Sequence, residues 1–174
     1  MNKILSLILI LSITSCSSIA FWQSDEIDPD EPRELIDFNE RFEFIENWET
    51  KFKGQNTLNN FIPAFSGNNL FFVDPEGNVS NMDIESGEVL WETELETIIS
   101  AGIVAGFGKL FLSDDQGNLI SLDQEDGSIV WRSFAGGEVL ANVDVDAGLV
   151  IVKTASGFLN AFNIETGTEE WSYR

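Results

Sequence analysis

The chain has 174 residues, among which Asp and Glu number 30, Lys and Arg number 9, and histidine is absent, giving a formal net charge of −21. This charge argues against a nucleic-acid partner and against adsorption onto anionic lipid, because both need clustered basic residues. Without histidine the chain has neither a Ser-His-Asp triad nor an imidazole-ligated zinc site, so the composition disfavours an enzyme.

The N-terminal segment of the sequence predicts that the protein is exported from the cytoplasm. Lys3 precedes the apolar stretch Ile4–Ile13, which is shorter than the about 20 residues needed to span a bilayer. We therefore expect residues 1–15 to be a signal peptide.

Cys16 is the only cysteine, so no intrachain disulfide can form within this chain. Ile13, Thr14 and Ser15 before it resemble the bacterial lipobox, in which the cysteine is acylated and becomes the first residue of the mature protein. This resemblance implies lipidation of Cys16, with palmitate among its acyl chains. Ser17 in the next position resembles the sorting pattern for delivery to the outer membrane.

Residues 16–44 are expected to form the lipidated N-terminus and a tether. The segment Ser24–Pro32 is acidic and contains two prolines, so it cannot bury apolar surface and should be extended. An acidic segment that binds a partner is the alternative. Residues 33–47 are richer in apolar side chains and fit either a short helix or a strand leading into Trp48.

An internal repeat dominates residues 45–174. Trp91, Trp131 and Trp171 are spaced by 40 residues, and Trp48 precedes the first of them by 43. Two sets of glycines keep the same period: Gly77, Gly117 and Gly157, then Gly87, Gly127 and Gly167. A period of about 40 residues with short apolar runs between turns is typical of propeller blades. We expect three repeats, at about residues 55–95, 96–135 and 136–174.

Each repeat divides into four short strands joined by turns. We expect the first strands at Ile62–Ser66, Ala101–Ala105 and Ala141–Val145, and the second at Leu70–Val73, Leu110–Ser113 and Leu149–Lys153. The first set of glycines then supplies a turn between the second and third strands, because glycine tolerates positive φ. The second set supplies the turn before the fourth strand, which carries the tryptophan.

The third strands predict how the sheets pack. Leu119, Ile120 and Leu122 are all apolar without alternation, so both faces of this strand should be buried between like sheets. The tryptophans should then fill the space between neighbouring sheets. The sequence predicts an all-β fold, a β-propeller of four-stranded antiparallel blades. Large side chains should be exposed on its two outer faces, namely those around Phe65, Phe71, Phe72, Phe158, Phe162 and Trp171.

Carboxylates are the remaining candidates for chemistry. Most of them lie in expected turns, where Asp is favoured because its side chain bonds to nearby backbone; these are Asp74, Asp114, Asp115, Asp123 and Asp126. Calcium binding or acid/base catalysis is the alternative role. We predict no catalytic, cofactor-binding or metal-binding residue.

The last two strands of each repeat follow the pattern Gly-x-Leu-x-x-Leu-Asp-x-x-x-Gly-x-x-x-Trp, with departures such as Asn163 for the Asp. With the lipobox, the acidic tether and Trp48, this pattern resembles the BamB family, the lipoproteins of the outer-membrane β-barrel assembly machinery. The repeats alone also resemble the wider quinoprotein propellers, which include pyrroloquinoline quinone dehydrogenases. The resemblance implies an eight-bladed ring, so we expect this sequence of about three blades to be partial.

The resemblance further implies a non-enzymatic scaffold without a cofactor, anchored by lipid to the periplasmic face of the outer membrane. Its implied partners are the other subunits of the machinery, with unfolded outer-membrane proteins as a further candidate. Two alternatives stay open: a fragment of a membrane-anchored quinoprotein dehydrogenase, and a propeller binding module of another envelope complex. Only the dehydrogenase needs cofactor-stacking and calcium-binding residues at the centre of the ring.

Overall fold

A computed structural model of the chain describes residues 41–51 and 61–174. The chain divides into two units, Met1–Glu43 and Phe44–Arg174, and the second holds every strand of the described part. The predicted signal peptide, Cys16 and the acidic tether lie outside the described residues. In residues 41–51 and 61–174, no helix has the length and apolarity needed to cross a membrane. Residues 41–47, for which the sequence allowed helix or strand, form neither.

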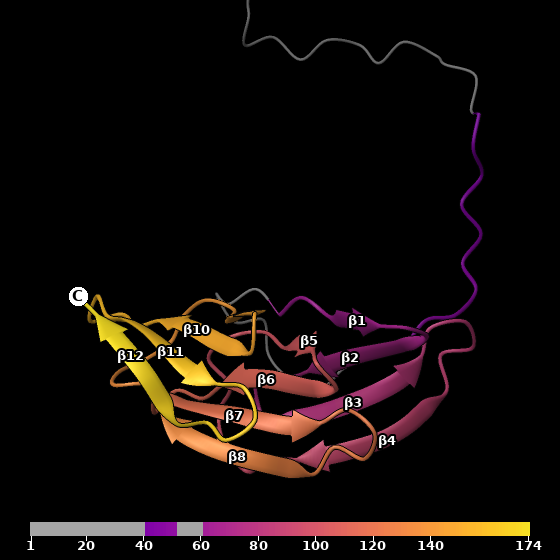
Figure 1. Ribbon diagram of the computed structural model, residues 1–174. Helices are drawn as coiled ribbons and strands as arrows, with labels where there is room; N and C mark the ends of the chain where they lie inside the picture. Colours follow the sequence, from indigo (N-terminus) through magenta and orange to yellow (C-terminus); the bar gives the residue numbers. More distant parts are fainter. Residues whose placement is uncertain (1–40, 52–60) are drawn as a thin grey trace, which may run out of the picture. The chain divides into compact units, whose positions relative to one another are not determined.

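The second unit contains three sheets of four strands each (Figure 1). We call them blades 1, 2 and 3. Blade 1 consists of β1 (Ala64–Ser66), β2 (Asn69–Val73), β3 (Asn78–Asp83) and β4 (Val89–Glu94). Blade 2 consists of β5 (Val104–Gly106), β6 (Lys109–Ser113), β7 (Asn118–Asp123) and β8 (Ile129–Phe134). Blade 3 consists of β9 (Asp144–Asp146), β10 (Leu149–Lys153), β11 (Leu159–Asn163) and β12 (Glu169–Tyr173).

Strands pair with their sequence neighbours, and every pairing is antiparallel. Each blade therefore has the four-stranded antiparallel order that the repeat predicts. The third and fourth strands slip register at the same place in each blade, after Asn81, Ser121 and Ala161. In each blade, the tryptophan of the fourth strand pairs with the last residue of the third strand before the slip. Because a bulge twists a strand locally and redirects a side chain, this irregularity helps to set the direction of the indole.

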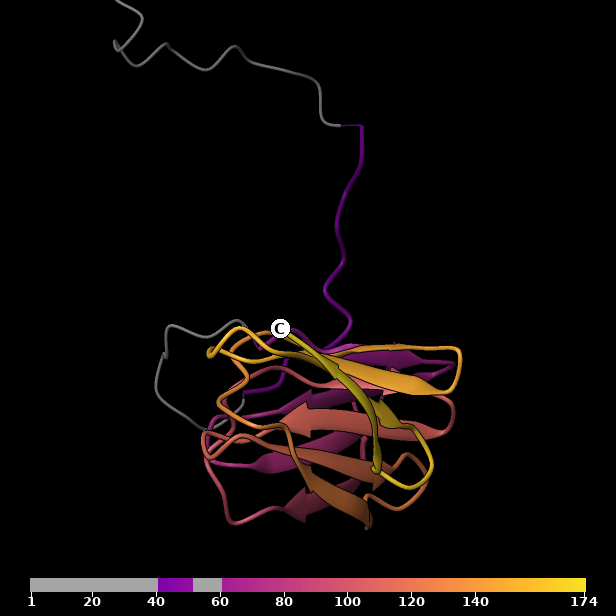
Figure 2. The ribbon, with the colours of Figure 1, turned by 60° about the vertical axis from the view of Figure 1, so that its left-hand side comes forward.

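The blades stack face to face and bury two apolar layers (Figure 2). Phe71, Val73 and Val79 of blade 1 pack against Leu110, Leu112 and Leu122 of blade 2. Phe111, Leu119 and Trp131 of blade 2 pack against Val150, Val152 and Phe162 of blade 3. Burying each such side chain stabilises the fold by about 1.5–3 kcal/mol. Blade 2 thus has both faces covered, as the apolar residues Leu119, Ile120 and Leu122 of β7 predict.

Two details of the sequence prediction are wrong. The first strands of blades 2 and 3 begin at Val104 and Asp144, three residues later than expected. The segment before β5 is buried at Ala101 and Ile103 but is held by an isolated bridge from Ile99 to Asp114. Its apolar residues therefore reflect burial without regular strand pairing.

The second error concerns the outer faces. Phe71 and Phe162, expected to be exposed, are buried. Side chains alternate across a strand, and these two point inward to the apolar layers on either side of blade 2. Phe65 and Trp171, which were also expected on open surfaces, are exposed.

Candidate functional site

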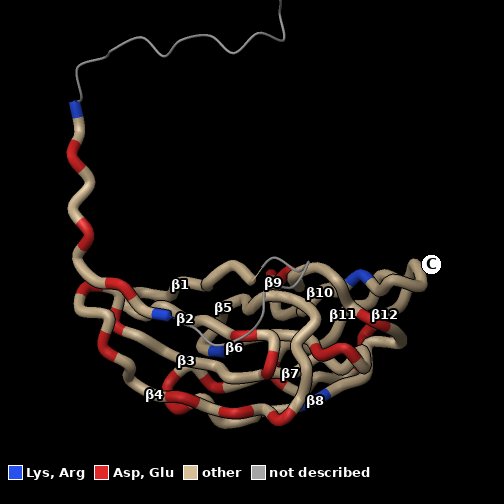
Figure 3. Tube along the Cα trace, turned by 180° about the vertical axis from the view of Figure 1, so that it is seen from behind, with Lys and Arg blue, Asp and Glu red and all other residues tan. Residues whose placement is uncertain are grey.

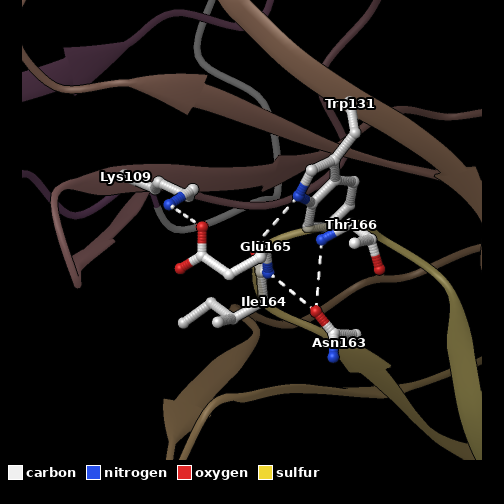
Figure 4. A network of polar contacts seen from close by, with 6 residues as sticks. All are labelled: Lys109, Trp131, Asn163, Ile164, Glu165 and Thr166. Atoms are coloured by element: carbon white, nitrogen blue, oxygen red, sulfur yellow. Dashed lines mark hydrogen bonds and ion pairs between the residues drawn. The ribbon is translucent and has the colours of Figure 1, made fainter.

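The tryptophans of the fourth strands join each blade to the next. The indole Nε1 of Trp91 in blade 1 donates a hydrogen bond to the backbone oxygen of Gln124 in blade 2 at 3.1 Å. Trp131 in blade 2 makes the same bond to Ile164 in blade 3 at 3.0 Å (Figure 4). Each acceptor lies in the turn between the third and fourth strands of the following blade. We call this contact the tryptophan latch.

Trp48 makes a third latch, although it lies outside the regular period. Its Nε1 donates to the backbone oxygen of Ile84 at 2.9 Å, in the equivalent turn of blade 1. The segment before the first repeat therefore contacts blade 1 through a tryptophan, in the same way as the fourth strand of one blade contacts the next blade. Trp171 of blade 3 has no following blade within the described residues, and its side chain is exposed.

The second set of glycines receives these indoles. A Cβ atom at Gly127 would lie 2.7 Å from the Trp91 ring, and one at Gly167 would lie 2.6 Å from the Trp131 ring. Gly87 stands in the same relation to Trp48, at 2.7 Å. These glycines also have positive φ, between 69° and 73°. Both the close approach of the ring and the left-handed backbone thus require glycine here.

The first set of glycines closes the turn between the second and third strands. In blades 1 and 2 this turn is organised by a carboxylate, because Asp74 accepts the backbone N–H groups of Glu76 and Asn78, and Asp114 those of Gln116 and Asn118. Asp74 and Asp114 are buried. In blade 3 the Thr154 hydroxyl accepts the N–H of Phe158 at 3.1 Å instead. These carboxylates are therefore occupied with holding the backbone.

In blades 1 and 2 the second turn of the repeat also uses a carboxylate in this way. Backbone and side-chain hydrogen bonds from Ser86 hold the pKa of Asp83 below its usual value. Hydrogen bonds from Ser128 lower the pKa of Asp126 in the corresponding turn of blade 2. Asn163 fills the place of Asp83 in blade 3 and accepts the N–H groups of Glu165 and Thr166 (Figure 4). A lowered pKa of this kind indicates a carboxylate that stabilises a turn and not one poised to accept a proton.

Within residues 41–51 and 61–174, no group of three or more His, Cys, Asp or Glu side chains is placed to hold a metal ion. Acidic residues are instead distributed over all three blades (Figure 3). One pocket of about 380 Å³ lies beside the outer part of blade 1 and includes Lys51, Asp74 and Glu92 in its lining. A second, of about 660 Å³, lies at the junction of blades 1 and 2.

Sequence reasoning missed two contacts between blades. The buried Ser100 hydroxyl lies 2.7 Å from the backbone oxygen of Val139 and 2.9 Å from that of Asp114, and so ties the inner ends of two blades together. The Lys109 ammonium lies 2.7 Å from the Glu165 carboxylate, which joins blade 2 to blade 3. Neither residue repeats with the 40-residue period, so the columns that revealed the tryptophans and glycines could not show them.

Comparison with known proteins agrees with this architecture. The sequence profile of a family described as "Outer membrane protein assembly factor BamB" matches residues 75–174. The protein of that name from Pseudomonas aeruginosa is 35% identical over 104 residues, which cover 59% of this chain and 26% of the relative. The one from Kangiella koreensis is 34% identical over 79 residues, which cover 44% of this chain and 20% of the relative. The chain thus matches about a quarter or less of the length of these relatives.

Solved structures show the same fold. The crystal structure of BamB from Moraxella catarrhalis matches with a TM-score of 0.61 and 24% identity, over 65% of this chain and 35% of that one. A quinohemoprotein alcohol dehydrogenase from Pseudomonas putida HK5 matches with a TM-score of 0.60 and 17% identity, over 66% and 20%. At these identities the likeness is one of fold. It confirms the prediction of a β-propeller built from four-stranded antiparallel blades.

Proposed function

This chain belongs to the family of the outer membrane protein assembly factor BamB, and from that premise we propose that it is a scaffold that assists the assembly of β-barrel proteins in the outer membrane. In this proposal the blades present surfaces to other subunits of the assembly machinery, and unfolded outer-membrane proteins are a further candidate partner. The protein performs no chemical reaction and needs no cofactor.

The main support for the proposal is that the residues repeated from blade to blade serve packing and turn formation. The latches join successive blades at Trp91 and Trp131, and Trp48 joins the preceding segment to blade 1. The repeated glycines admit the indoles, and Asp74 and Asp114 hold turns. Residues that serve packing in every repeat support a rigid binding surface. The match to relatives named as assembly factors supports outer-membrane protein assembly as the process that this surface serves.

The experiment is a complementation assay in a bacterium from which the gene has been deleted. We expect the deletion to lower the amount of folded outer-membrane barrel proteins, and the intact gene to restore it. A tagged protein should co-purify with subunits of the assembly machinery from detergent extracts. Normal levels of folded barrel proteins in the deletion strain, without co-purification, would contradict the proposal.

We further propose that acyl chains on Cys16 hold the protein at the periplasmic face of the outer membrane, with residues 16–44 as the spacer to the blades. The lipobox residues Ile13–Cys16 and the short apolar stretch before them support this anchor. Each methylene buried in the bilayer contributes about 0.8 kcal/mol, so several acyl chains bind far more firmly than one. The Cys16→Ala variant should lose labelled palmitate and leave the membrane fraction, whereas Ser18→Ala should keep both. Labelled palmitate on the Cys16→Ala variant would show that the anchor lies elsewhere.

The absence of catalysis has its own test, because the fold is shared with quinohemoprotein alcohol dehydrogenases. We expect the protein, incubated with pyrroloquinoline quinone and calcium, to show no dye-linked oxidation of alcohols or sugars. The quinohemoprotein alcohol dehydrogenase itself, treated in the same way, is the positive control. Turnover above the rate of the free cofactor would contradict the scaffold role and identify the protein as an oxidoreductase.

A further inference from the structure

The pocket of about 660 Å³ lies between the strands of blade 1 and two turns of blade 2. Its lining includes Asn69, Asn81 and Trp91 from blade 1, and Phe107 and Glu125 from blade 2. It therefore combines aromatic side chains, a buried amide and a carboxylate.

Asn81 is the first unusual feature of this pocket. Its side chain is only 3% exposed, and its Oδ1 atom has no hydrogen-bond partner among the described residues. A buried carbonyl oxygen is normally satisfied by a donor. Because Asn81 lines the pocket, a donor that enters the pocket is the natural means of satisfying it.

The next junction shows which group pairs with the carboxylate of such a place, although the Ser121 hydroxyl, which stands there in the place of Asn81, also has no hydrogen-bond partner among the described residues. Between blades 2 and 3, Lys109 extends from the start of β6 to Glu165, and its ammonium lies 2.7 Å from the carboxylate (Figure 4). The Lys109 side chain is 15% exposed there. One repeat earlier, Asn69 stands in the place of Lys109 and Glu125 in the place of Glu165. The junction of blades 1 and 2 thus retains the carboxylate but lacks the lysine.

No Lys or Arg side chain in the described part of the chain forms an ion pair with Glu125. Asp123 also lines the pocket, and it accepts the backbone N–H of Glu125 at 2.7 Å. The ammonium of Lys109, whose residue lines the pocket from blade 2, is engaged with Glu165 at the other junction. The free charge at the pocket is therefore negative.

Phe107 completes the contrast between the two junctions. It occupies the turn between β5 and β6 with φ of 54°, which is unusual for a residue other than glycine, and the residue is 57% exposed. The equivalent residue in blade 3 is Ala147. An exposed aromatic ring at the edge of an acidic pocket suits a long side chain that ends in a cation, because the stem packs on the ring and the charge is attracted by its face.

We propose that this pocket binds the side chain of a lysine or arginine from a partner polypeptide. The cationic group pairs with Glu125 and donates to Oδ1 of Asn81, while its methylene stem lies along Phe107. The partner thereby supplies the contact that Lys109 makes from within the chain at the next junction. The proposal does not depend on the assembly process in which the protein takes part, since it rests on the pocket alone.

The test follows the indole N–H resonance of Trp91 and the side-chain amide of Asn81 by NMR as short peptides are added to the full chain. The probes are acetyl-Ala-Lys-Ala-amide, its arginine analogue, and an analogue with uncharged norleucine. We expect saturable shifts with the two basic peptides and at least about tenfold weaker binding of the norleucine peptide, since one lost charged contact of about 1.4 kcal/mol corresponds to a factor of ten. Equal binding of the norleucine peptide, or no saturable shift with either basic peptide, overturns the proposal.

Two variants give the matched comparison. Asn69→Lys should fill the pocket from within, pair with Glu125 as Lys109 pairs with Glu165, and weaken the basic peptides by about tenfold or more. Lys153→Asn changes the net charge in the opposite direction at an exposed position of blade 3 that does not line the pocket, and should leave the response of Trp91 unchanged. The indole resonances of the free variants show that the latches of Trp91 and Trp131 have formed. Unaltered binding to Asn69→Lys, or an equal loss in Lys153→Asn, contradicts the proposed site.

Discussion

Trp131 and Trp171 occupy the same place in successive repeats but have different surroundings. Both follow the same slip in register on the fourth strand of a blade. Trp131 is 8% exposed, since its ring lies on Gly167 and its Nε1 bonds to Ile164. Trp171 is 39% exposed, and no later blade is present among the described residues to receive it. The repeat therefore determines the fourth strand and its register, whereas the burial of its tryptophan depends on the presence of the following blade.

The largest expected effect comes from removing the two indoles in turn. Trp131→Ala should lower the free energy of unfolding by about 3–5 kcal/mol, because it leaves a cavity between blades 2 and 3. Trp171→Ala should lower it by less than about 1 kcal/mol, as expected for a surface substitution. Chemical denaturation followed by circular dichroism measures both changes. Equal losses would mean that the latch adds nothing to the stability of blade 2.

The glycines sharpen the same comparison. Gly167→Ala and Gly157→Ala both place a Cβ on a left-handed backbone, at φ of 69° and 90°, at a cost of about 1–2 kcal/mol each. Only at Gly167 does the new atom also meet the Trp131 ring, whereas nothing lies within 4 Å of it at Gly157. Gly167→Ala should therefore lose about 1–3 kcal/mol more, which is the usual cost of overpacking. If denaturation curves of the two variants coincide, the ring does not press on the glycine in solution.

The ion pair between Lys109 and Glu165 should contribute less. Glu165 is 64% exposed, so solvent screens the attraction, and Lys109→Met should lower the free energy of unfolding by about 1 kcal/mol or less. The difference from the unchanged protein should shrink as salt is added. Lys153→Met is the matched control, because Lys153 is exposed and no ion pair is found for it in the described part of the chain. A loss of stability that does not depend on salt would show that packing of the Lys109 methylene groups, and not the ion pair, causes the effect.

The smallest effect is a dependence on pH that distinguishes blade 1 from blade 3. Hydrogen bonds from Ser86 lower the pKa of Asp83 in the folded chain, so Asp83 stabilises the fold above its unfolded pKa of about 3.9. This contribution is lost as the pH falls through the folded pKa. Asp83→Asn should reduce the loss of stability in acid, since Asn163 already serves the equivalent turn of blade 3 without titrating. Thermal unfolding between about pH 2 and 6 tests this, and an unchanged acid slope would contradict it.

The sequence predicts the parts of the fold that obey the period. Gly127 and Gly167 recur because their positive φ and the close approach of an indole ring both require glycine. The tryptophans recur because the same indole contact joins each blade to the next. Features that break the period were missed, among them Ser100, Lys109 and the pocket around Asn81. Their roles depend on which blades lie opposite each other, which one repeat does not contain. The role of Cys16, outside the described residues, stays a prediction.

The latches also give the stack a polarity. In each of them the indole comes earlier in the chain than its acceptor, by 33 residues for Trp91 and Trp131 and by 36 for Trp48. A chain that emerges N-terminus first can therefore close each latch only after about one more blade has appeared. Such short loops cost little entropy to close, which favours folding by addition at one end. During that growth the newest blade carries a tryptophan whose hydrogen-bond acceptor has not yet been synthesised.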